Sequence, residues 1–359
     1  MASITVDGVT VTKGDRLILD GVDLFVADGE LLAVIGRSGC GKTSLLRAVA
    51  GLDEVTSGEV MLGGDIVTKD TPAQRRLAMV FQDSVLYPFL TVRGNVSFPL
   101  EMQRRPADEV ALRVAAEGRA MGIEQLFEAK PSQLSAGHRQ LVQVARAMVR
   151  APRALLLDEP LAMVDAKARN AMRVELRTVQ RGYGVTSLYV TNDPVEAMAM
   201  GDRVAVMSQG RVIQVDTPSA VYAAPRTIEV AEVTGDITLL TAAVTADPPG
   251  FWLVCGGLRV RAWPTELAGL VGGTVVVGIR PEGVVLAGSD TEAATTAGIV
   301  TRVETVGSHD LVTIDASGCP LRARTRPGAV RPGERVPVTV RRHVIFHPVT
   351  GERIGATGS

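Results

Sequence analysis

The sequence predicts an α/β fold followed by a smaller all-β domain. Up to about residue 235, strand-like and helix-like segments alternate, which is the pattern of a sheet covered by helices. Beyond that point the helical periodicity fades, and short alternating strands with glycine turns take over. A chain of 359 residues is also long for one compact unit. We therefore expect two domains, residues 1–235 and 236–359.

The first domain contains strands and helices of clear character. Apolar runs with a strand pattern are GELLAVIG (29–36), RALLLDEP (153–160) and TSLYVTND (186–193). Helical spacing of apolar residues occurs in KTSLLRAVAG (42–51, ending at Gly51), ADEVALRVAAEGRAMG (107–122) and SAGHRQLVQVARAMVR (135–150). The region from about residue 95 to 150 is therefore expected to form a helical subdomain.

The second domain is expected to be a small β-barrel or sandwich. FWLVCGGLRVRAW predicts a hairpin that turns at Gly256 and Gly257. Trp252 and Trp263 flank this hairpin, and we expect them in the core rather than in a ligand platform. His343 and His347 are separated by the strand-like VIF, a spacing that holds them apart and argues against a metal pair.

The composition argues against several classes of function. A net charge of −1 gives no basic surface of the kind that nucleic-acid binding demands. Cys40, Cys255 and Cys319 are odd in number and far apart, so we expect no disulfide framework. No secretory signal is visible, and no stretch approaches 18 uninterrupted apolar residues. We expect the chain to stay in the cytoplasm, where any contact with a membrane goes through a partner.

The segment GRSGCGKT fits the phosphate-loop pattern G-x-x-x-x-G-K-[ST] from Gly36 to Thr43. Glycines let backbone N–H groups curl around phosphate oxygens, where a side chain would block the approach. Lys42 adds a positive charge near the β- and γ-phosphates, and Thr43 offers a hydroxyl to Mg²⁺. The predicted nucleotide-binding residues of this loop are Gly36, Arg37, Ser38, Gly39, Cys40, Gly41, Lys42, Thr43 and Ser44.

Two further segments suit the chemistry of a nucleoside triphosphate. Asp158 and Glu159 stand at the end of a buried strand, where one carboxylate can join the Mg²⁺ shell and the other can take a proton from water. An acidic pair at a strand end is often only a solvated edge, and the phosphate loop favours the functional interpretation. Ser135 stands where a helix begins, which leaves that helix end open to an anion, although an ordinary serine cap is the alternative.

The order of these motifs resembles that of the nucleotide-binding subunits of ATP-binding-cassette (ABC) transporters. Over about residues 4–235, the phosphate loop is followed at that family's spacings by FQDSVLYPFLTVRGNV, LSAGH, LLLDEP, LAMVD and TNDPVEAMAMGDRVAVMSQGRVIQVDTP. GIRPE, VETVGSHDLVTI and FHPVTGERI resemble the tail of the carbohydrate-importer branch, the maltose and sn-glycerol-3-phosphate type. The resemblance implies a P-loop NTPase cassette with a helical subdomain, followed by an OB-like (TOBE) regulatory domain.

The same resemblance implies a role for each motif. Gln82 and Asp158 would join Thr43 in the Mg²⁺ shell, and Gln82 would also sense the γ-phosphate. The segment after Gln82 would touch the membrane subunits. Glu159 would be the general base for ATP hydrolysis, and Asn192 stands where the family carries a histidine that touches the γ-phosphate.

The resemblance also implies partners. Two ATP molecules would lie between two copies of the chain, because a phosphate wrapped by one loop has one open side that a second helix end can close. The residues supplied by the second copy would be Ser135, Ala136, Gly137, His138 and Asp165. Two transmembrane permease subunits and, indirectly, an extracytoplasmic solute-binding protein would complete the importer. The chain would lie at the cytoplasmic face of the cell membrane as a peripheral subunit.

The sequence departs from the family pattern at several positions. Lys13 occupies the place of an aromatic residue that stacks on adenine, and its stem can cover the base only apolarly. Ala136 replaces the first signature glycine, and His138 replaces a glutamine. Asn192 can donate a hydrogen bond but cannot become cationic or relay a proton. Losing one transition-state donor typically lowers a rate by ~10²–10³, so hydrolysis is either slow or sustained by the asparagine amide.

The leading interpretation is the ATP-hydrolysing subunit of an importer for a sugar or a glycerol-phosphate type of solute. One alternative is a slow or degenerate ATP switch, in which the β-rich tail binds a regulator and the cassette reports the nucleotide state. Another is a soluble ABC ATPase of repair or translation with no transport role. Such proteins carry paired cassettes, coiled coils or basic arms, and none of these is evident in the sequence.

Overall fold

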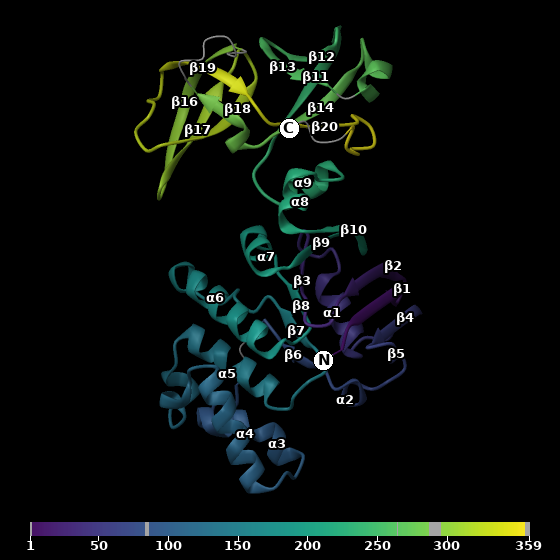
Figure 1. Ribbon diagram of the computed structural model, residues 1–359, viewed down its shortest axis with the longest axis vertical. Coiled ribbons are helices and arrows are strands. Elements are labelled where there is room, and N and C mark those ends of the chain that lie inside the picture. The colour runs from purple at the N-terminus through teal and green to yellow at the C-terminus, as the bar shows by residue number, and fades with distance from the viewer. Residues whose placement is uncertain (1, 83–85, 264, 287–295, 356–359) are drawn as a thin grey trace. The chain divides into compact units, whose positions relative to one another are not determined.

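A six-stranded sheet forms the centre of the first part of the chain (Figure 1). Its strand order is β10-β9-β3-β8-β7-β6, and all neighbours are parallel except the β9–β10 pair. The strands are β3 (Leu31–Ile35), β6 (Ala78–Val80), β7 (Leu155–Asp158), β8 (Ser187–Val190), β9 (Arg203–Ser208) and β10 (Arg211–Asp216). Every residue of β3, β7 and β8 is buried, as expected for parallel strands that are covered on both faces.

The structure is a computed structural model that describes residues 2–82, 86–263, 265–286 and 296–355. It divides into two compact units, Met1–Pro218 and Ser219–Ser359.

In the first unit, a second sheet is antiparallel and consists of β1 (Ile4–Lys13), β2 (Arg16–Val26), β4 (Ser57–Leu62) and β5 (Asp65–Ile66). Its apolar side chains share one core with helix α1 (Lys42–Ala50) and with the six-stranded sheet. Through this core, α1 packs against β2 of the antiparallel sheet and against β7 and β8 of the six-stranded sheet.

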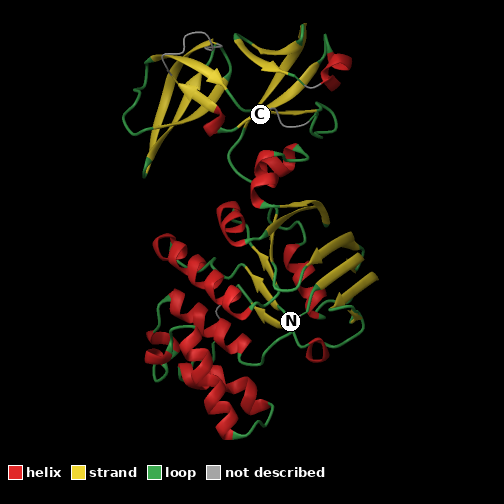
Figure 2. Ribbon diagram, in the orientation of Figure 1, coloured by secondary structure: helices red, strands yellow, loops and turns green. Residues whose placement is uncertain are grey.

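Most helices of the first unit lie between β6 and β8 in the sequence and gather in one region of that unit (Figure 2). They are α3 (Val92–Met102), α4 (Ala107–Ala120), α5 (Ala136–Met148) and α6 (Ala166–Tyr183), with short 3₁₀ turns at Glu124–Leu126 and Pro131–Gln133. The short helices α2 (Pro72–Arg75) and α7 (Pro194–Met200) precede β6 and follow β8. The helices predicted at 107–122 and 135–150 are confirmed.

The boundary between the units falls at the first residue of α8 (Pro218–Ala223), and the second unit continues with α9 (Ile228–Val233) and then with β structure. One five-stranded sheet contains β11 (Thr238–Asp247), β12 (Gly250–Cys255), β13 (Leu258–Ala262), β14 (Thr274–Ile279) and β20 (Val344–Phe346). The other contains β15 (Val284–Leu286), β16 (Thr296–Val306), β17 (His309–Asp315), β18 (Pro320–Thr325) and β19 (Arg335–Val340). Short 3₁₀ turns lie at Thr265–Leu270 and Pro281–Gly283. Apolar residues of both sheets form one core, in agreement with the predicted all-β domain.

The hairpin predicted in the second unit is confirmed, but the predicted place of its tryptophans is wrong. Strands β12 and β13 pair in antiparallel fashion across the turn at Gly256 and Gly257. Trp263 is 58% exposed. The guanidinium of Arg261 lies 5.0 Å from the ring centroid of Trp252 and 4.8 Å from that of Trp263. Aromatic faces attract cations, and this contact places both rings beside the Arg261 guanidinium, which is also paired with Asp247, instead of in the core.

The sequence predicts no disulfide framework, but the structure contains one disulfide bond, between Cys255 and Cys319. Cys255 ends β12 in one sheet, and Cys319 directly precedes β18 in the other. The turns beside them pack closely, since a Cβ atom on Gly257 would lie 2.5 Å from the Cβ of Ser317. The packing of the two sheets brings together cysteines that are 64 residues apart, and sequence spacing does not reveal such a contact. Cys40 is a free, buried thiol.

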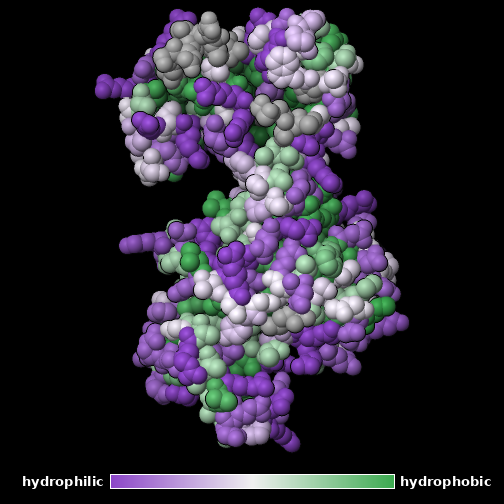
Figure 3. All heavy atoms as spheres, in the orientation of Figure 1, coloured by the Kyte–Doolittle hydropathy of each residue, from purple (hydrophilic) through white to green (hydrophobic). Residues whose placement is uncertain are grey.

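The surface of the first unit is mainly polar on the face that Figure 3 displays, with apolar side chains scattered between hydrophilic ones. None of the helices in the described part of the chain has both the length and the apolar character that spanning a lipid bilayer requires. In the second unit, VIF forms strand β20, as predicted, and it separates His343 from His347. The described residues contain no group of three or more histidine, cysteine, aspartate or glutamate side chains that could hold a metal ion.

Candidate functional site

The carboxyl ends of three neighbouring parallel strands meet at one edge of the six-stranded sheet. β8 lies between β3 and β7, and its Val190 pairs with Val34 on one side and with Asp158 on the other. The phosphate loop follows β3, Glu159 follows β7, and Asn192 follows β8. The topology therefore brings three distant segments of the sequence to the edge where α/β sheets bind their ligands.

The phosphate loop has a backbone that requires glycine. A Cβ atom on Gly36 would lie 2.2 Å from the carbonyl oxygen of Met207. Gly39 and Gly41 have φ angles of 80° and 110°, in the left-handed region that favours glycine. Helix α1 begins at Lys42, directly after Gly41, so its free N–H groups and positive dipole end face the loop. Such a loop suits an anion. Its exposed residues are Arg37, Ser38 and Gly39.

Lys42 is held inside the loop and is only 5% exposed. Its ammonium donates hydrogen bonds to the carbonyl oxygens of Gly36 at 2.8 Å and Arg37 at 3.1 Å, and it lies 3.8 Å from the sulfur of Cys40. Ser44 follows in the first turn of α1 and is partly buried. A compact positive charge fixed at this place can neutralise the oxygens of a phosphate group bound in the loop.

Thr43 and Asp158 are in contact although 115 residues separate them in the sequence. The Thr43 hydroxyl donates to Oδ1 of Asp158 at 3.1 Å. Burial raises the pKa of Asp158, and the Thr43 hydrogen bond and the charge of Lys42 oppose that effect. Hydroxyl and carboxylate oxygens are the ligands that Mg²⁺ prefers in proteins. This pair of side chains therefore fits a magnesium ion bound beside the phosphate loop.

Gln82 lies beyond the end of β6, the strand next to β7. Val80 of β6 pairs with Leu157 of β7, so Gln82 follows the same edge of the sheet, and its side chain is exposed. An amide oxygen from this position would add to the oxygen ligands of Thr43 and Asp158. Residues 83–85 of the predicted membrane-contact segment lie outside the described residues.

Glu159 and Asn192 form a direct contact at the sheet edge. The backbone N–H of Glu159 donates to the carbonyl oxygen of Val190 at 2.9 Å, and its φ angle is 45°. The side-chain amide of Asn192 donates to Oε1 of Glu159. Among the described residues, no hydrogen bond reaches the other carboxylate oxygen, Oε2. The sequence had linked Asn192 to the γ-phosphate, and the structure adds this link to the predicted general base.

Lys13 is part of an ion-pair cluster. Its ammonium lies 2.7 Å from Oδ2 of Asp53, and Arg47 of α1 lies 2.9 Å from Oδ1 of the same carboxylate. Burial favours a higher pKa for Asp53, but the hydrogen bonds from Arg47 and Lys13 outweigh it and lower the pKa. Half of the Lys13 side chain stays exposed (51%), so its stem can still cover a flat ligand. Sequence reasoning missed Asp53 and Arg47, because neither residue belongs to one of the nucleotide-binding motifs.

The residues predicted to act on a second copy cap two helices. The Ser135 hydroxyl accepts from the backbone N–H of His138 at 3.1 Å, which confirms Ser135 as the cap of α5. Asp165 caps α6 and accepts from the N–H of Ala168 at 3.0 Å. Gly137 lies in the first turn of α5, where a Cβ atom would approach the sulfur of Met172 to 3.2 Å. Ala136 is the first residue of α5, and Ser135 and Ala136 are accessible in the single chain.

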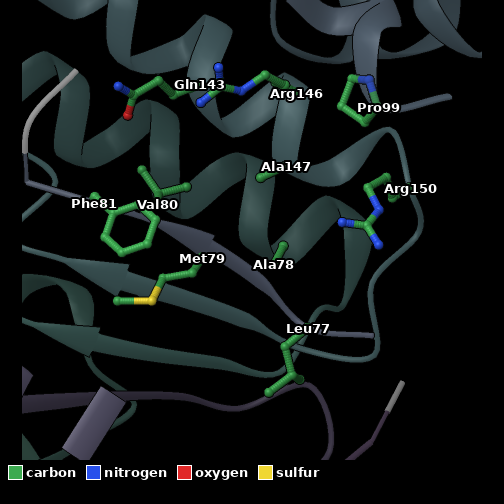
Figure 4. A pocket seen from close by; sticks show the side chains of 10 residues that line it. All are labelled: Leu77, Ala78, Met79, Val80, Phe81, Pro99, Gln143, Arg146, Ala147 and Arg150. Atoms are coloured by element: carbon green, nitrogen blue, oxygen red, sulfur yellow. The ribbon is translucent and has the colours of Figure 1, made fainter. Parts of the chain in front are cut away.

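A pocket of about 170 Å³ lies between β6 and the helices of the first unit (Figure 4). The labelled side chains of Val80, Phe81 and Pro99 give it an apolar part, and Arg146 and Arg150 of the α5 region add positive charge. Its complete lining is Leu77, Ala78, Met79, Val80, Phe81, Pro99, Gln143, Arg146, Ala147 and Arg150.

The segment that precedes α3 presents aromatic side chains. Phe81 is 43% exposed and Phe89 is 70% exposed. Asn95 is fully buried, accepts from the N–H of Tyr87 at 2.8 Å, and donates to the carbonyl of Leu90 at 3.3 Å. A buried amide thus fixes the backbone that carries Phe89. This surface suits a partner with an apolar side.

Comparisons with known proteins agree with this geometry. The family model described as ABC transporter matches residues 19–162, and the model described as TOBE domain matches residues 277–346. The chain is 40% identical to the sn-glycerol-3-phosphate import ATP-binding protein UgpC of Chromohalobacter salexigens, with 100% of this chain and 97% of that protein covered. The chain belongs to the ABC transporter ATP-binding family.

Other relatives of this ABC subunit support the same assignment. The UgpC protein of Rhizobium meliloti is 44% identical, with 80% of each chain covered. Among solved structures, cbiO1 from Clostridium perfringens, part of the ABC transporter complex cbiONQ, matches with a TM-score of 0.57 and 28% identity. That match covers 61% of this chain and 89% of cbiO1. The protein is therefore an ABC-type ATPase subunit with a P-loop cassette and a carboxy-terminal TOBE domain.

Proposed function

We propose that this chain hydrolyses ATP at the edge of the six-stranded sheet and thereby drives solute import. The observation that carries the proposal is the meeting of the phosphate loop, the Thr43–Asp158 pair and Glu159 at one sheet edge. The N–H groups of the loop and the Lys42 ammonium would bind the β- and γ-phosphates. Residues 1–235 would form the cassette, and residues 236–359 would form the regulatory TOBE domain.

Thr43, Asp158 and Gln82 would hold Mg²⁺, in keeping with the oxygen donors that they offer. The bound ion would supply positive charge to the oxygens of the transferred phosphoryl group. Glu159 would accept the proton of the attacking water through Oε2, while Oε1 stays bonded to the Asn192 amide. Lys13 would cover the adenine with its stem in place of a stacked ring.

A second copy of the chain would complete the site. Its helix α5 would present its amino-terminal end to the γ-phosphate, since that end is accessible and carries a positive dipole. The residues supplied in this way would be Ser135, Ala136, Gly137, His138 and Asp165. Closure of two copies around ATP would exclude water from the phosphates and strengthen every electrostatic contact there.

Two transmembrane permease subunits would dock on the pocket beside β6 and on the exposed Phe81 and Phe89. An amphipathic helix of the partner would suit this surface, because the pocket is apolar on one side and carries arginines on the other. The chain would then lie at the cytoplasmic face of the membrane, and an extracytoplasmic binding protein would deliver the solute.

A sugar or a glycerol-phosphate compound is the proposed cargo, since the relatives that match along the whole chain are named as sn-glycerol-3-phosphate import proteins. Uptake of labelled sn-glycerol-3-phosphate into vesicles that hold the assembled transporter and internal ATP tests this assignment. ATP-dependent uptake is expected. If a sugar stimulates the ATPase activity and sn-glycerol-3-phosphate does not, a sugar is the favoured cargo.

The contact between Asn192 and Glu159 favours a second candidate, a slow ATP switch. The asparagine amide is bonded to the general base, and it cannot relay a proton as a histidine can. The ATPase rate of the assembled complex with Asn192→His decides between the two. A rate that rises strongly supports the slow switch. An unchanged rate supports an asparagine that replaces the histidine in full.

A further inference from the structure

A buried polar network lies next to the loop that carries Asn192. Tyr189, Thr191 and Glu196 expose only 0%, 2% and 4% of their surfaces. The Tyr189 hydroxyl donates to Oε1 of Glu196, and the Thr191 hydroxyl donates to Oε2. Both carboxyl oxygens of a helix α7 residue are therefore bonded to hydroxyl groups from β8 and from the residue that follows it.

The network fixes the backbone on both sides of Asn192. The Thr191 hydroxyl, which donates to Glu196, also accepts from the backbone N–H of Asp193 at 3.0 Å. The Asp193 carboxylate accepts from the N–H groups of Val195 at 2.8 Å and Glu196 at 3.3 Å. Thr191 and Asp193 are the chain neighbours of Asn192, so the position of its side chain depends on these bonds.

A carboxyl group at this place is energetically expensive. Burial raises the pKa of Glu196, and the hydrogen bonds from Thr191 and Tyr189 oppose that rise. An apolar side chain on the buried face of α7 would avoid the desolvation of the carboxyl group entirely. A polar network of this kind rigidifies its surroundings when every member is bonded. We therefore interpret the network as a device that fixes the backbone of the loop that carries Asn192.

We propose that Glu196 is a positioning residue for ATP hydrolysis that acts through Thr191 and Asn192 on the general base Glu159. This proposal rests on the proposed function, in which Glu159 takes the proton of the attacking water. Because the Asn192 amide bonds to Oε1 of Glu159, the network sets the direction of the carboxylate and the oxygen that faces the water. The side chains of Glu196 and Thr191 are buried, so the effect falls on kcat and leaves the KM for ATP in place.

The test measures kcat and KM of the full-length chain with the variants Thr191→Val, Thr191→Ser and Glu196→Gln. Thr191→Val keeps the size of the side chain and removes the hydroxyl, and kcat is expected to fall by ~10- to 100-fold because the base is misplaced. Thr191→Ser retains the hydroxyl and is expected to retain most of the rate. Thr178→Val on α6 is a matched control, since the Thr178 hydroxyl donates to the carbonyl of Val174 within its own helix.

A double-mutant cycle separates positioning from a merely structural role. In an Asn192→Ala background, Thr191→Val is expected to lower kcat no further, because the side chain through which it acts is gone. Equal losses in both backgrounds, or a Thr191→Val enzyme with the wild-type kcat, would overturn the proposal. If the Glu196→Gln variant does not fold, the comparison of Thr191→Val with Thr191→Ser and the double-mutant cycle still test the proposal. A wild-type chain without ATPase activity would contradict the proposed function itself.

Discussion

Arg75 supports the helix that presents the phosphate loop, and its replacement should destabilise the first unit. The side chain is 1% exposed, and its guanidinium donates to the carbonyl oxygens of Ala48, Val49, Thr68 and Asp70 at 2.7, 2.8, 2.7 and 3.1 Å. Ala48 and Val49 lie in the last turn of α1, beyond which the helix no longer supplies i+4 N–H partners, and the Ala48 carbonyl also accepts from the capping N–H of Gly51 at 3.1 Å. A hydrogen bond to a charged group contributes ~1.5–3 kcal/mol.

Arg75→Met keeps most of the apolar stem and removes the guanidinium. The loss of four bonds is partly offset, because an arginine whose pKa is lowered by burial no longer has to be desolvated. We expect a loss of about 3 kcal/mol in the free energy of unfolding. For a unit of this size, that lowers Tm by about 6–12 °C. The Tm of Arg75→Lys should lie between those of the wild type and Arg75→Met. An ammonium has three donors and cannot reach four carbonyls from one plane.

Differential scanning calorimetry of the full chain measures this change as a shift of the transition of the first unit. Arg76→Ala is the matched control, since the neighbouring Arg76 is exposed, and the control should change stability by less than about 0.5 kcal/mol. Amide hydrogen exchange should show faster opening of α1 in Arg75→Met. Equal Tm values for Arg75→Met and Arg76→Ala would refute the reasoning.

Three further predictions concern the loop and the second unit. Gly36→Ala places a methyl group against the carbonyl of Met207 and should weaken ATP binding by about 10- to 100-fold in calorimetric titration; unchanged affinity would contradict the close approach. Burial lowers the pKa of His343 to about 4, so between pH 6.5 and 4 the unfolded chain binds a proton that the folded chain does not. The Tm of the second unit should therefore fall as the pH is lowered from 6.5 to 4, and it should fall less in the His343→Phe variant. Reduction of the Cys255–Cys319 bond should lower stability by about 4 kcal/mol, and a Tm indifferent to reductant would argue against the pairing.

The sequence anticipated those parts of the site that depend on local pattern. The phosphate loop and α1 are contiguous in the chain, so glycine spacing and helical periodicity were sufficient to place them. The buried strands that end at Asp158 and Val190 were visible as apolar runs. The hairpin turn at Gly256 and Gly257 was equally local.

Contacts made by tertiary packing could not be predicted in this way. Thr43 meets Asp158 only because β3 and β7 flank the same strand. The amide of Asn192 reaches Glu159 for the same reason, and the sequence alone suggested a phosphate contact for it. Trp263 was expected in the core because large apolar rings are usually buried, but a nearby arginine keeps it at the surface.

The most direct test of the account is ATP hydrolysis and self-association by the full-length chain with Glu159→Gln. The amide keeps the shape of the side chain and cannot accept a proton from water. With ATP and Mg²⁺, the variant is expected to lose at least ~10²-fold in rate, to retain ATP, and to sediment as a dimer. A variant that hydrolyses ATP at the wild-type rate, or that stays monomeric with ATP bound, would contradict the account.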